Sequence, residues 1–494
     1  MKGRRFSTIH ELLDVKYPDL HLKLLQERSS RSVYTLEKQG RAVYYVKVYS
    51  GKDFLSRARN RFFSRTLYEA TMLENLKAHG IPVPEVHDHI LHAGASVLIT
   101  RAIDPARSLW QEPPSDRGEV MLGMASLLLR HGFSHRDLHP GNIILDFEGK
   151  PFLVDAYEIS TLTHVSQRDI VGLFSQVFNS SDVSLTDLER HLDGIPQVDD
   201  SHGLAERILR RALRTKRTYV RKRVRRSLRE GSFSTVRVAD SYTAYIRRGA
   251  VIDVENLISE HERNVEQGIN ILKTQEKTQL SRVGQYCVKS YRAPRLFQEP
   301  YARRSWKGLL ALLYNGIGTA EPFAVVIFRD GRSALITSAI PHQDLDRFLG
   351  ESYETLDMRE KLRIARALGS VLGYLHVRRI YHADMKACNI KIDPETLGIY
   401  FLDTDRVRQT RGLSDRRRYE NLVQINTSIP RRVSRSVRMA FIHAYAERMK
   451  LNPRELFARV WNFSRSRDIV YCTAKGDQFE TWSPEYEGKT RSLT

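Results

Sequence analysis

Apolar and polar positions follow two different patterns around one short polar stretch of the chain. Residues 120–130, VMLGMASLLLR, place apolar side chains at helical spacing, and residues 143–159, IILDFEGKPFLVDAYEI, contain two short apolar runs around a turn. Between them, residues 131–142, HGFSHRDLHPGN, are rich in polar side chains. The pattern predicts a helix, a polar loop and two short strands, and a loop held between buried elements commonly carries catalytic groups.

The same order of elements recurs in the second half of the chain. An apolar strand with one lysine comes first, in AVYYVKVYS (Lys47) and again in QYCVKSYR (Lys289), and a helical stretch, a second apolar strand and a polar loop follow in both halves. Such an internal repeat indicates two related domains. We expect domains at residues 1–230 and 266–494, with residues 231–265 adding strands and a helix between them, because that segment lacks a Pro, Gly or Ser run.

Polar residues of the two halves also share their spacing. In each half an Asp is followed by an Asn five residues later and by a second Asp eighteen or nineteen residues later: Asp137, Asn142 and Asp155, and then Asp384, Asn389 and Asp403. A single His-x-Asp sequence would carry little weight in a chain of 494 residues. Two copies with the same spacing are hard to attribute to chance.

The residues of the first half suit phosphoryl transfer. That reaction needs a lysine on the nucleotide phosphates, an acid that pairs with it, metal ligands, and a carboxylate near the attacking hydroxyl. Lys47 lies in an apolar strand, where an unpaired lysine is costly, and Glu69 in the following helical stretch is its expected partner. Asp137 would accept or orient the proton of the acceptor hydroxyl, while Asn142 and Asp155 would bind Mg²⁺.

Two further features of the pattern concern the role of a loop histidine and the segments expected to cover the phosphates. His135, at the start of the polar loop, is expected to pack and hydrogen-bond rather than to act as a base. The segments that would cover the phosphates, ERSSRSVY and TQEKTQLSRV, have serine and arginine where a glycine-rich loop has glycine. The chain is therefore expected to be a distant relative of the protein kinase fold.

At the level of motifs, the chain resembles the bacterial lipopolysaccharide core kinases, which phosphorylate heptose or 3-deoxy-octulosonate (Kdo) sugars. The resemblance rests on HRDLHPGNIIL with FLVDAYEI, and more closely on HADMKACNIKID with YFLDTDRVR. It implies two tandem protein-kinase-like domains, each with a small β-rich N-lobe and a helical C-lobe. It also implies ATP and Mg²⁺ as cofactors.

Carried to the second half, the resemblance implies one set of site residues: Lys289, Asp384, Asn389 and Asp403. Aligning AHGIPVPE with YNGIGTAE places Ser305 opposite Glu69, among several basic residues. Lys289 is then expected to lack a carboxylate partner, which favours the first half as the catalytic domain and makes the second a candidate pseudokinase. In the first half, Ala156, Tyr157 and Glu158 stand where the family more often has x-Asp-Arg after the metal-binding Asp.

The positive charge of the chain predicts anionic binding partners. Lys and Arg outnumber Asp and Glu by 79 to 58, a formal charge of +21. Residues 207–229 hold twelve of these cations around an apolar stripe at helical spacing, which predicts a basic amphipathic helix. It would be the last helix of the first C-lobe, a surface for lipid phosphates, or both. Nucleic acid is not expected, since no recognised nucleic-acid motif accompanies the charge.

Other features concern location. Three cysteines without a CxxC pair favour a reducing compartment, and we expect neither a signal peptide nor a spanning helix. The chain is therefore expected to be cytoplasmic and peripheral to the inner membrane, with lipopolysaccharide or another anionic glycolipid as partner. Two alternatives stay open: an inactive pseudokinase scaffold or sensor of envelope glycolipids, and a kinase with a small-molecule or protein acceptor.

Overall fold

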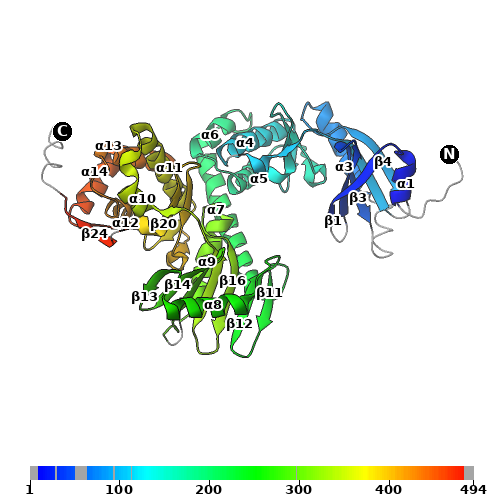
Figure 1. The fold of residues 1–494 in the computed structure, drawn as a ribbon. Helices are drawn as coiled ribbons and strands as arrows, with labels where there is room; N and C mark the ends of the chain where they lie inside the picture. Colours follow the sequence, from blue (N-terminus) through cyan, green and yellow to red (C-terminus); the bar gives the residue numbers. More distant parts are fainter. Residues whose placement is uncertain are drawn as a thin grey trace. The chain divides into compact units, whose positions relative to one another are not determined.

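The chain folds into two compact units, Met1–Ala212 and Leu213–Thr494, which are described separately. The computed structural model describes the following residues: 9–27, 31–50, 64–92, 95–112, 114–295, 298–474 and 476–482. Both units combine a sheet with a group of helices, so the predicted mixed α+β class is confirmed (Figure 1).

The first unit begins with a helix and a five-stranded antiparallel sheet of order β1-β2-β3-β5-β4. Its sheet portion contains α1 (Ile9–Lys16), β1 (His21–Glu27), β2 (Arg31–Lys38), β3 (Arg41–Ser50), α3 (Arg65–Ala78), β4 (Val86–His92) and β5 (Ala95–Arg101). Its second portion contains β6 (Arg107–Ser108), α4 (Pro114–Arg130), β7 (Phe133–His135), β8 (Ile143–Leu145), β9 (Pro151–Leu153), β10 (Ile159–Thr161), α5 (Gln167–Ser180), α6 (Leu185–Asp193) and the start of α7 (Ser201–Ser227).

Strand alternation explains how β3 presents its lysine. Val46 and Val48 point to one face of the sheet and join a buried cluster with Leu36 and Ile99. Because successive side chains of a strand point to opposite faces, Lys47 faces the other side. Strand β3 pairs with both β2 and β5, so it is a central strand of the sheet. These pairings fix the position of Lys47 along the sheet.

The second unit repeats this plan with a larger sheet of order β11-β12-β16-β17-β15-β14-β13. Its sheet portion contains β11 (Ser234–Val238), β12 (Tyr242–Arg247), α8 (Val254–Gln267), β13 (Ile271–Gln275), β14 (Thr278–Val283), β15 (Tyr286–Tyr291), α9 (Tyr301–Tyr314), β16 (Pro322–Phe328) and β17 (Ser333–Ser338). The run β13-β14-β15-β17-β16 has the same order as β1-β2-β3-β5-β4 in the first unit, with α9 in the chain position of α3.

Helices dominate the rest of the second unit. This portion contains β18 (Gln343–Asp344), α10 (Leu345–Glu351), α11 (Met358–Val377), β19 (Ile380–His382), β20 (Ile390–Asp393), β21 (Gly398–Phe401), β22 (Val407–Gln409), α12 (Asp415–Asn426), α13 (Arg435–Met449), α14 (Pro453–Ser464), β23 (Ile469–Thr473) and β24 (Gly476–Glu480). Asp357 and Glu360 form a capping box that starts α11. Leu372 and Leu375 of this helix are fully buried in one core with Tyr445 of α13.

The division between the units falls inside α7, earlier in the chain than the predicted boundary at residue 230. The reason is packing, since Val224 and Leu228 pack against the buried cluster around Trp306 of α9. Trp306 also donates a hydrogen bond from its indole nitrogen to Ser227 Oγ at 2.9 Å. Residues 231–265 form β11, β12 and most of α8, and the two strands extend the sheet of the second unit.

Candidate active sites

The first candidate site is built around the lysine of β3. Lys47 forms an ion pair with Glu69 of α3, and Lys47 Nζ lies 3.6 Å from Oδ1 of Asp155. Glu69 is almost fully buried, with 1% of its side chain exposed. Burial alone would lower the pKa of Lys47, but the carboxylates of Glu69 and Asp155 raise it, so the lysine stays charged. The structure thus brings together the two residues that the sequence paired.

Asp155 receives a second cation. Arg31, at the start of β2, places Nη1 3.3 Å from Oδ2 of Asp155. Burial alone would raise the pKa of Asp155, but Lys47 and Arg31 lower it. Asp155 also has a φ of 66°, a left-handed conformation that non-glycine residues seldom adopt and that occurs often at functional sites.

The polar loop after β7 carries the expected catalytic carboxylate. The Asp137 amide donates to His135 Nδ1 at 3.1 Å, and the Asn142 side-chain amide donates to the Asp137 carbonyl oxygen at 2.9 Å. The Asp137 side chain is 72% exposed, so its carboxylate is open to an acceptor. Burial lowers the pKa of His135 to about 4, which keeps the ring neutral near pH 7. His135 therefore shapes the loop, in line with its predicted packing role.

A cavity of about 250 Å³ connects these residues. Its lining includes Arg31, Lys47, Glu69, Asn142 and Asp155. Asp137 does not line it. The cavity therefore adjoins the two metal-binding candidates, Asn142 and Asp155, and leaves the candidate catalytic carboxylate of Asp137 outside it.

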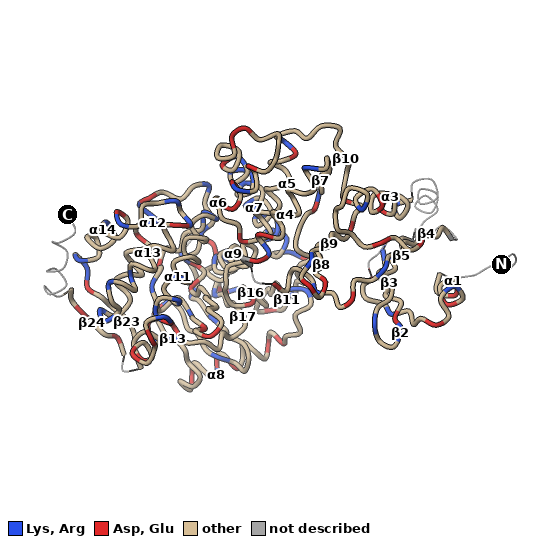
Figure 2. The backbone as a smooth tube through the Cα atoms, turned by 90° about the horizontal axis from the view of Figure 1, so that it is seen from above, with Lys and Arg blue, Asp and Glu red and all other residues tan. Residues whose placement is uncertain are grey.

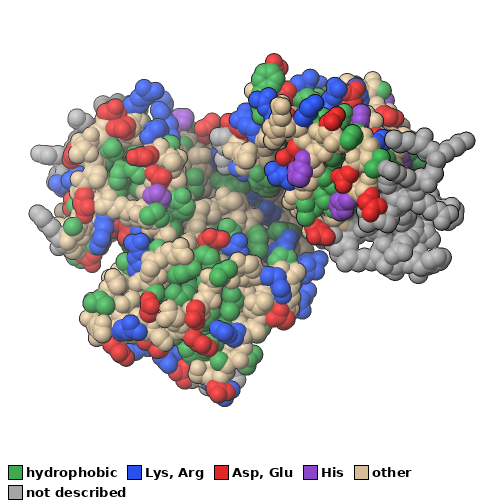
Figure 3. All heavy atoms as spheres, turned by 45° about the vertical axis from the view of Figure 1, so that its right-hand side comes forward, with side chains coloured by type: hydrophobic (Ala, Val, Ile, Leu, Met, Phe, Trp, Pro, Cys, Tyr) green, Lys and Arg blue, Asp and Glu red, His purple; other side chains and the backbone are tan. Residues whose placement is uncertain are grey.

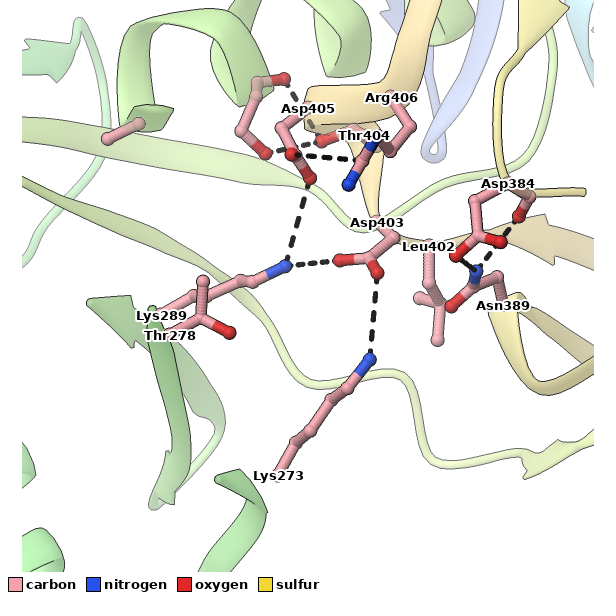
Figure 4. A network of polar contacts seen from close by, with 12 residues as sticks. Lys273, Thr278, Lys289, Asp384, Asn389, Leu402, Asp403, Thr404, Asp405 and Arg406 are labelled. Atoms are coloured by element: carbon pink, nitrogen blue, oxygen red, sulfur yellow. Dashed lines mark hydrogen bonds and ion pairs between the residues drawn. The ribbon is translucent and has the colours of Figure 1, made fainter. Parts of the chain in front are cut away.

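The second candidate site has the same plan with different partners (Figure 4). Lys289 of β15 forms an ion pair with Oδ1 of Asp403 and lies 4.0 Å from Oδ1 of Asp405. Lys273 of β13 lies 3.6 Å from the other oxygen of Asp403. Burial alone would raise the pKa of Asp403, but Lys289 and Lys273 lower it to about 2. Asp403 has a φ of 50°, so the left-handed Asp recurs in both units.

The prediction that Lys289 lacks a carboxylate partner is wrong. Ser305 does occupy the position on α9 that Glu69 has on α3, but it turns to Thr404, with the two hydroxyl oxygens 2.7 Å apart. Asp405, two residues after the metal-binding candidate Asp403, supplies the additional carboxylate near Lys289. Residue-by-residue alignment missed this because the charge moved from a helix to a turn.

Close packing explains why α9 carries no glutamate. Gly308 lies one turn after Ser305, and a side chain at Gly308 would overlap the carbonyl group of Thr404. The helix can therefore approach the turn closely enough for the hydrogen bond from Thr404 Oγ1 to the Ser305 carbonyl oxygen, at 3.0 Å. Met72 occupies the aligned position on α3 and is itself buried. The side chain of Met72 requires a wider space between α3 and the turn after Asp155, and this space also accommodates the side chain of Glu69.

The catalytic loop of the second unit repeats the first in its backbone contacts. The Asp384 amide donates to His382 Nδ1 at 3.2 Å. The Asn389 side-chain amide donates to the Asp384 carbonyl oxygen at 2.9 Å (Figure 4). Asp384 is less open than Asp137, with 33% of its side chain exposed, and Lys386 Nζ lies 3.3 Å from its carboxylate. Burial lowers the pKa of His382.

Sequence reasoning missed one residue in each unit. Gln176 of α5 accepts from the Leu138 amide at 2.7 Å and donates to the His135 carbonyl oxygen at 3.0 Å, which holds the loop that carries Asp137 in place. Gln424 of α12 accepts from the Met385 amide at 3.0 Å in the same way. The signal was available, because each glutamine follows the loop aspartate of its own half at nearly the same distance in the sequence.

The oxygen atoms present in each site fit Mg²⁺. Asn142 with Asp155, and Asn389 with Asp403, offer an amide oxygen and a carboxylate, and Mg²⁺ prefers a few such ligands together with phosphates and water. In the part of the chain that the structure describes, no cluster of three or more His, Cys, Asp or Glu forms a self-sufficient metal site.

Comparisons with known proteins point to the second unit. Residues 261–445 match the model of the lipopolysaccharide kinase (Kdo/WaaP) family. This segment contains Lys289, Ser305, Asp384, Asn389 and Asp403. No curated protein matches the chain.

Among solved structures, WbdD, described as a bifunctional kinase-methyltransferase, is 18% identical with a TM-score of 0.28 in its 2.2 Å crystal form. The match covers 38% of this chain and 45% of WbdD, so the chain spans under half the length of that protein. The PknI kinase domain of Mycobacterium tuberculosis is 18% identical, with a TM-score of 0.24, and the match covers 37% of this chain and 77% of that domain. Scores this low carry no structural argument.

Proposed function

We propose that this chain is an ATP-dependent phosphotransferase that acts on sugar hydroxyls of lipopolysaccharide core, heptose or Kdo, and that its principal active site lies in the second unit. One observation carries the proposal: the family match at residues 261–445 falls on a site in which Lys289, Asp403 and Asp405 form one ion-pair network beside Asp384. The reason for preferring the first unit was the missing partner of Lys289, and that reason no longer holds.

Each residue then has a distinct task. Lys289 would bind the α and β phosphates, and Asn389 and Asp403 would hold Mg²⁺, which neutralises charge on the transferred group when bound. Asp384 would accept or orient the proton of the sugar hydroxyl, since its half-buried carboxylate is the acid of that loop. Neutral His382 would keep the loop in shape through its contact with the Asp384 amide.

The first unit is proposed to bind nucleotide as well. Beside a cavity, Lys47 forms an ion pair with Glu69 and lies close to Asp155, the candidate metal ligand. Tyr157 stands where the second unit has Asp405, so the two sites are related but not interchangeable. A supporting role for the first unit, in binding acceptor or nucleotide, is consistent with both features.

Charge supports an anionic acceptor at an anionic surface. Lys and Arg residues occur throughout both units (Figure 2), and on the face drawn in Figure 3 they alternate with acidic and apolar side chains. The apolar stripe of α7 is buried, at Ile208 and Val220 for example, while Arg221, Lys222 and Arg225 are exposed. No described helix has the length and hydrophobicity of a bilayer-spanning segment. We propose peripheral, cytoplasmic contact with the inner membrane, without nucleic acid.

Vesicle binding tests the membrane part of the proposal. Replacing Arg221, Lys222 and Arg225 with glutamine should weaken co-sedimentation with anionic vesicles at low salt, because each cation near such a surface contributes about 1 kcal/mol. Vesicles of neutral lipid are the control. Unchanged sedimentation with anionic vesicles would leave α7 as a purely structural helix.

Label transfer tests the catalytic part. Purified protein is incubated with labelled ATP, Mg²⁺ and dephosphorylated lipopolysaccharide core, and wild type is compared with Asp384→Asn and Asp137→Asn. Loss of transfer by a factor of about 10² to 10⁴ in Asp384→Asn alone is the expected result. Loss only in Asp137→Asn would return the active site to the first unit. No transfer with nucleotide binding intact would favour a different acceptor or an inactive scaffold.

A further inference from the structure

Both carboxylate oxygens of the metal-binding candidate in the second unit are occupied by lysines. Oδ1 of Asp403 pairs with Lys289, the expected nucleotide lysine, and Oδ2 lies 3.6 Å from Nζ of Lys273 (Figure 4). Lys273 belongs to β13, which pairs with β14 to form a hairpin whose turn is Glu276 and Lys277. No sequence motif assigns a role to Lys273.

In the first unit, two cations likewise lie close to the two carboxylate oxygens of Asp155, but the hairpin cation comes from a different strand. Lys47 Nζ lies 3.6 Å from Oδ1 of Asp155, and Arg31 Nη1 lies 3.3 Å from Oδ2. Arg31 begins β2, the second strand of the first hairpin, whereas Lys273 lies on the first strand of its hairpin. Residues 28–30, between these two strands in the sequence, lie outside the described residues. Two unlike residues thus bring a cation to the same oxygen, which argues against an accident of one loop.

The hairpins also lack what they would need to hold phosphate with backbone amides. A glycine-rich loop allows close approach of N–H groups to phosphate oxygens, and neither ERSSRSVY nor TQEKTQLSRV contains a glycine. A side-chain cation on the hairpin can supply the same favourable charge, with a stronger hydrogen bond than a neutral amide provides.

Charge balance indicates where that cation goes when the site fills. The side chains of Lys273, Lys289 and Arg406 face those of Asp403 and Asp405, so both carboxylates of the site are already paired with cations when no nucleotide is bound. A metal on Asp403 would lie within a few ångströms of Lys273, and like charges repel at that range. The phosphates beside the metal are the nearest new anions, and Lys273 is half-exposed on a long flexible stem.

We propose, resting on the proposed nucleotide-binding function, that Lys273 and Arg31 are phosphate-binding residues that replace the glycine-rich loop. Without nucleotide each occupies an oxygen of the metal-binding aspartate, and with nucleotide each pairs with the terminal phosphates. The hairpin cation therefore selects for phosphorylated nucleotides over nucleosides, in addition to the lysine of the central strand.

Nucleotide titration of the full chain tests this assignment. A fluorescent ATP analogue is titrated with Mg²⁺ into protein that carries Asp155→Asn, which removes the metal ligand of the first unit, and adenosine is used as a competitor. Lys273→Gln should raise the dissociation constant for Mg-ATP by about tenfold, the size of one charge-assisted hydrogen bond, and leave the competition by adenosine unchanged. Lys273→Arg should stay close to the unmodified affinity because it keeps the charge.

Lys277→Gln is the matched control. It removes the same charge from the same hairpin, at a residue that lines the groove beside α8, and should change affinity by less than about twofold. An unchanged or lowered dissociation constant in Lys273→Gln would overturn the assignment while leaving nucleotide binding intact. Failure of both the unmodified chain and the Asp155→Asn protein to bind Mg-ATP would contradict the proposed function itself, and the assignment with it.

Discussion

The two units hold an equivalent lysine with carboxylates from different elements. In the first, Glu69 comes from α3, and the turn after the metal-binding aspartate has Tyr157. In the second, α9 offers only Ser305, and Asp405 comes from the turn itself. Helix α9, which has Ser305 in place of a glutamate, packs closely against the turn at Thr404. The element that supplies the carboxylate therefore depends on the spacing between this helix and the turn.

The difference shows that the requirement of the site is local charge balance rather than a particular residue. A buried lysine needs an anion within a few ångströms, and any element that reaches it can supply one. Loss of the helix glutamate in a sequence is therefore weak evidence for an inactive domain when a second acid lies near the metal-binding aspartate.

The largest expected difference between the two units is the loss of stability at acidic pH. Burial lowers the pKa of His261 and His376 to about 4 in the second unit, and that of His135 to about 4 in the first. In the unfolded chain these histidines bind a proton near pH 6.5, whereas in the folded chain they stay neutral down to about pH 4. The contribution of the neutral histidines to the stability of the folded state is therefore complete above pH 6.5 and is lost as the pH falls toward 4. Between pH 6.5 and 5 we expect the free energy of unfolding to fall by about 3 kcal/mol in the second unit, from His261 and His376, and by about 1.5 kcal/mol in the first, from His135.

Hydrogen exchange read by mass spectrometry follows each unit separately across this range. The His376→Gln variant should reduce the pH dependence of the second unit, where the pKa values of His261 and His382 are also lowered, and should leave that of the first unit unchanged. Equal slopes in the two units would contradict the comparison.

Removing the metal-binding aspartate should cost the second unit more than the first. Asp403→Asn removes the carboxylate nearest Lys273 and leaves Lys289 with only Asp405, 4.0 Å away, and we expect a loss of about 3 kcal/mol in unfolding free energy. Asp155→Asn should cost about 1 kcal/mol, because Glu69 still balances Lys47. Urea unfolding measures both variants, and a larger loss in Asp155→Asn would reverse the account.

A glutamate at position 305 should harm the second unit rather than repair it. Ser305 is 1% exposed and lies against Thr404, so Ser305→Glu would bury a charge without space, at a cost of about 2 kcal/mol. Ser305→Ala loses only the hydroxyl contact and should cost about 1 kcal/mol. Thermal unfolding compares them. A more stable Ser305→Glu protein would show that the helix can move away from the turn.

Much of the first site could be predicted from the sequence because its residues lie in patterned segments. An apolar strand with one lysine, a helix with a glutamate and a loop with spaced acids each have a recognisable period, and the structure brings Lys47, Glu69 and Asp155 together as expected. The matching order of strands in the two sheets likewise follows from the repeated pattern.

The second site could not be predicted fully because its contacts depend on distances between elements. Whether α9 or the turn supplies the anion is decided by packing at Gly308, and no periodicity encodes that approach. Lys273 and Arg31 lie on hairpins at positions that do not align, so the repeat gave no signal. The end of α7 could not be assigned to a unit until its apolar residues were seen against Trp306.

The central claim is that Asp405 does in the second unit what Glu69 does in the first. The most direct test is the rate of label transfer from ATP to dephosphorylated lipopolysaccharide core by Asp405→Asn, measured beside Glu69→Gln. The account predicts a loss of about tenfold or more in Asp405→Asn, since Lys289 loses a charge partner, and a rate close to wild type in Glu69→Gln. Full transfer by Asp405→Asn would contradict it.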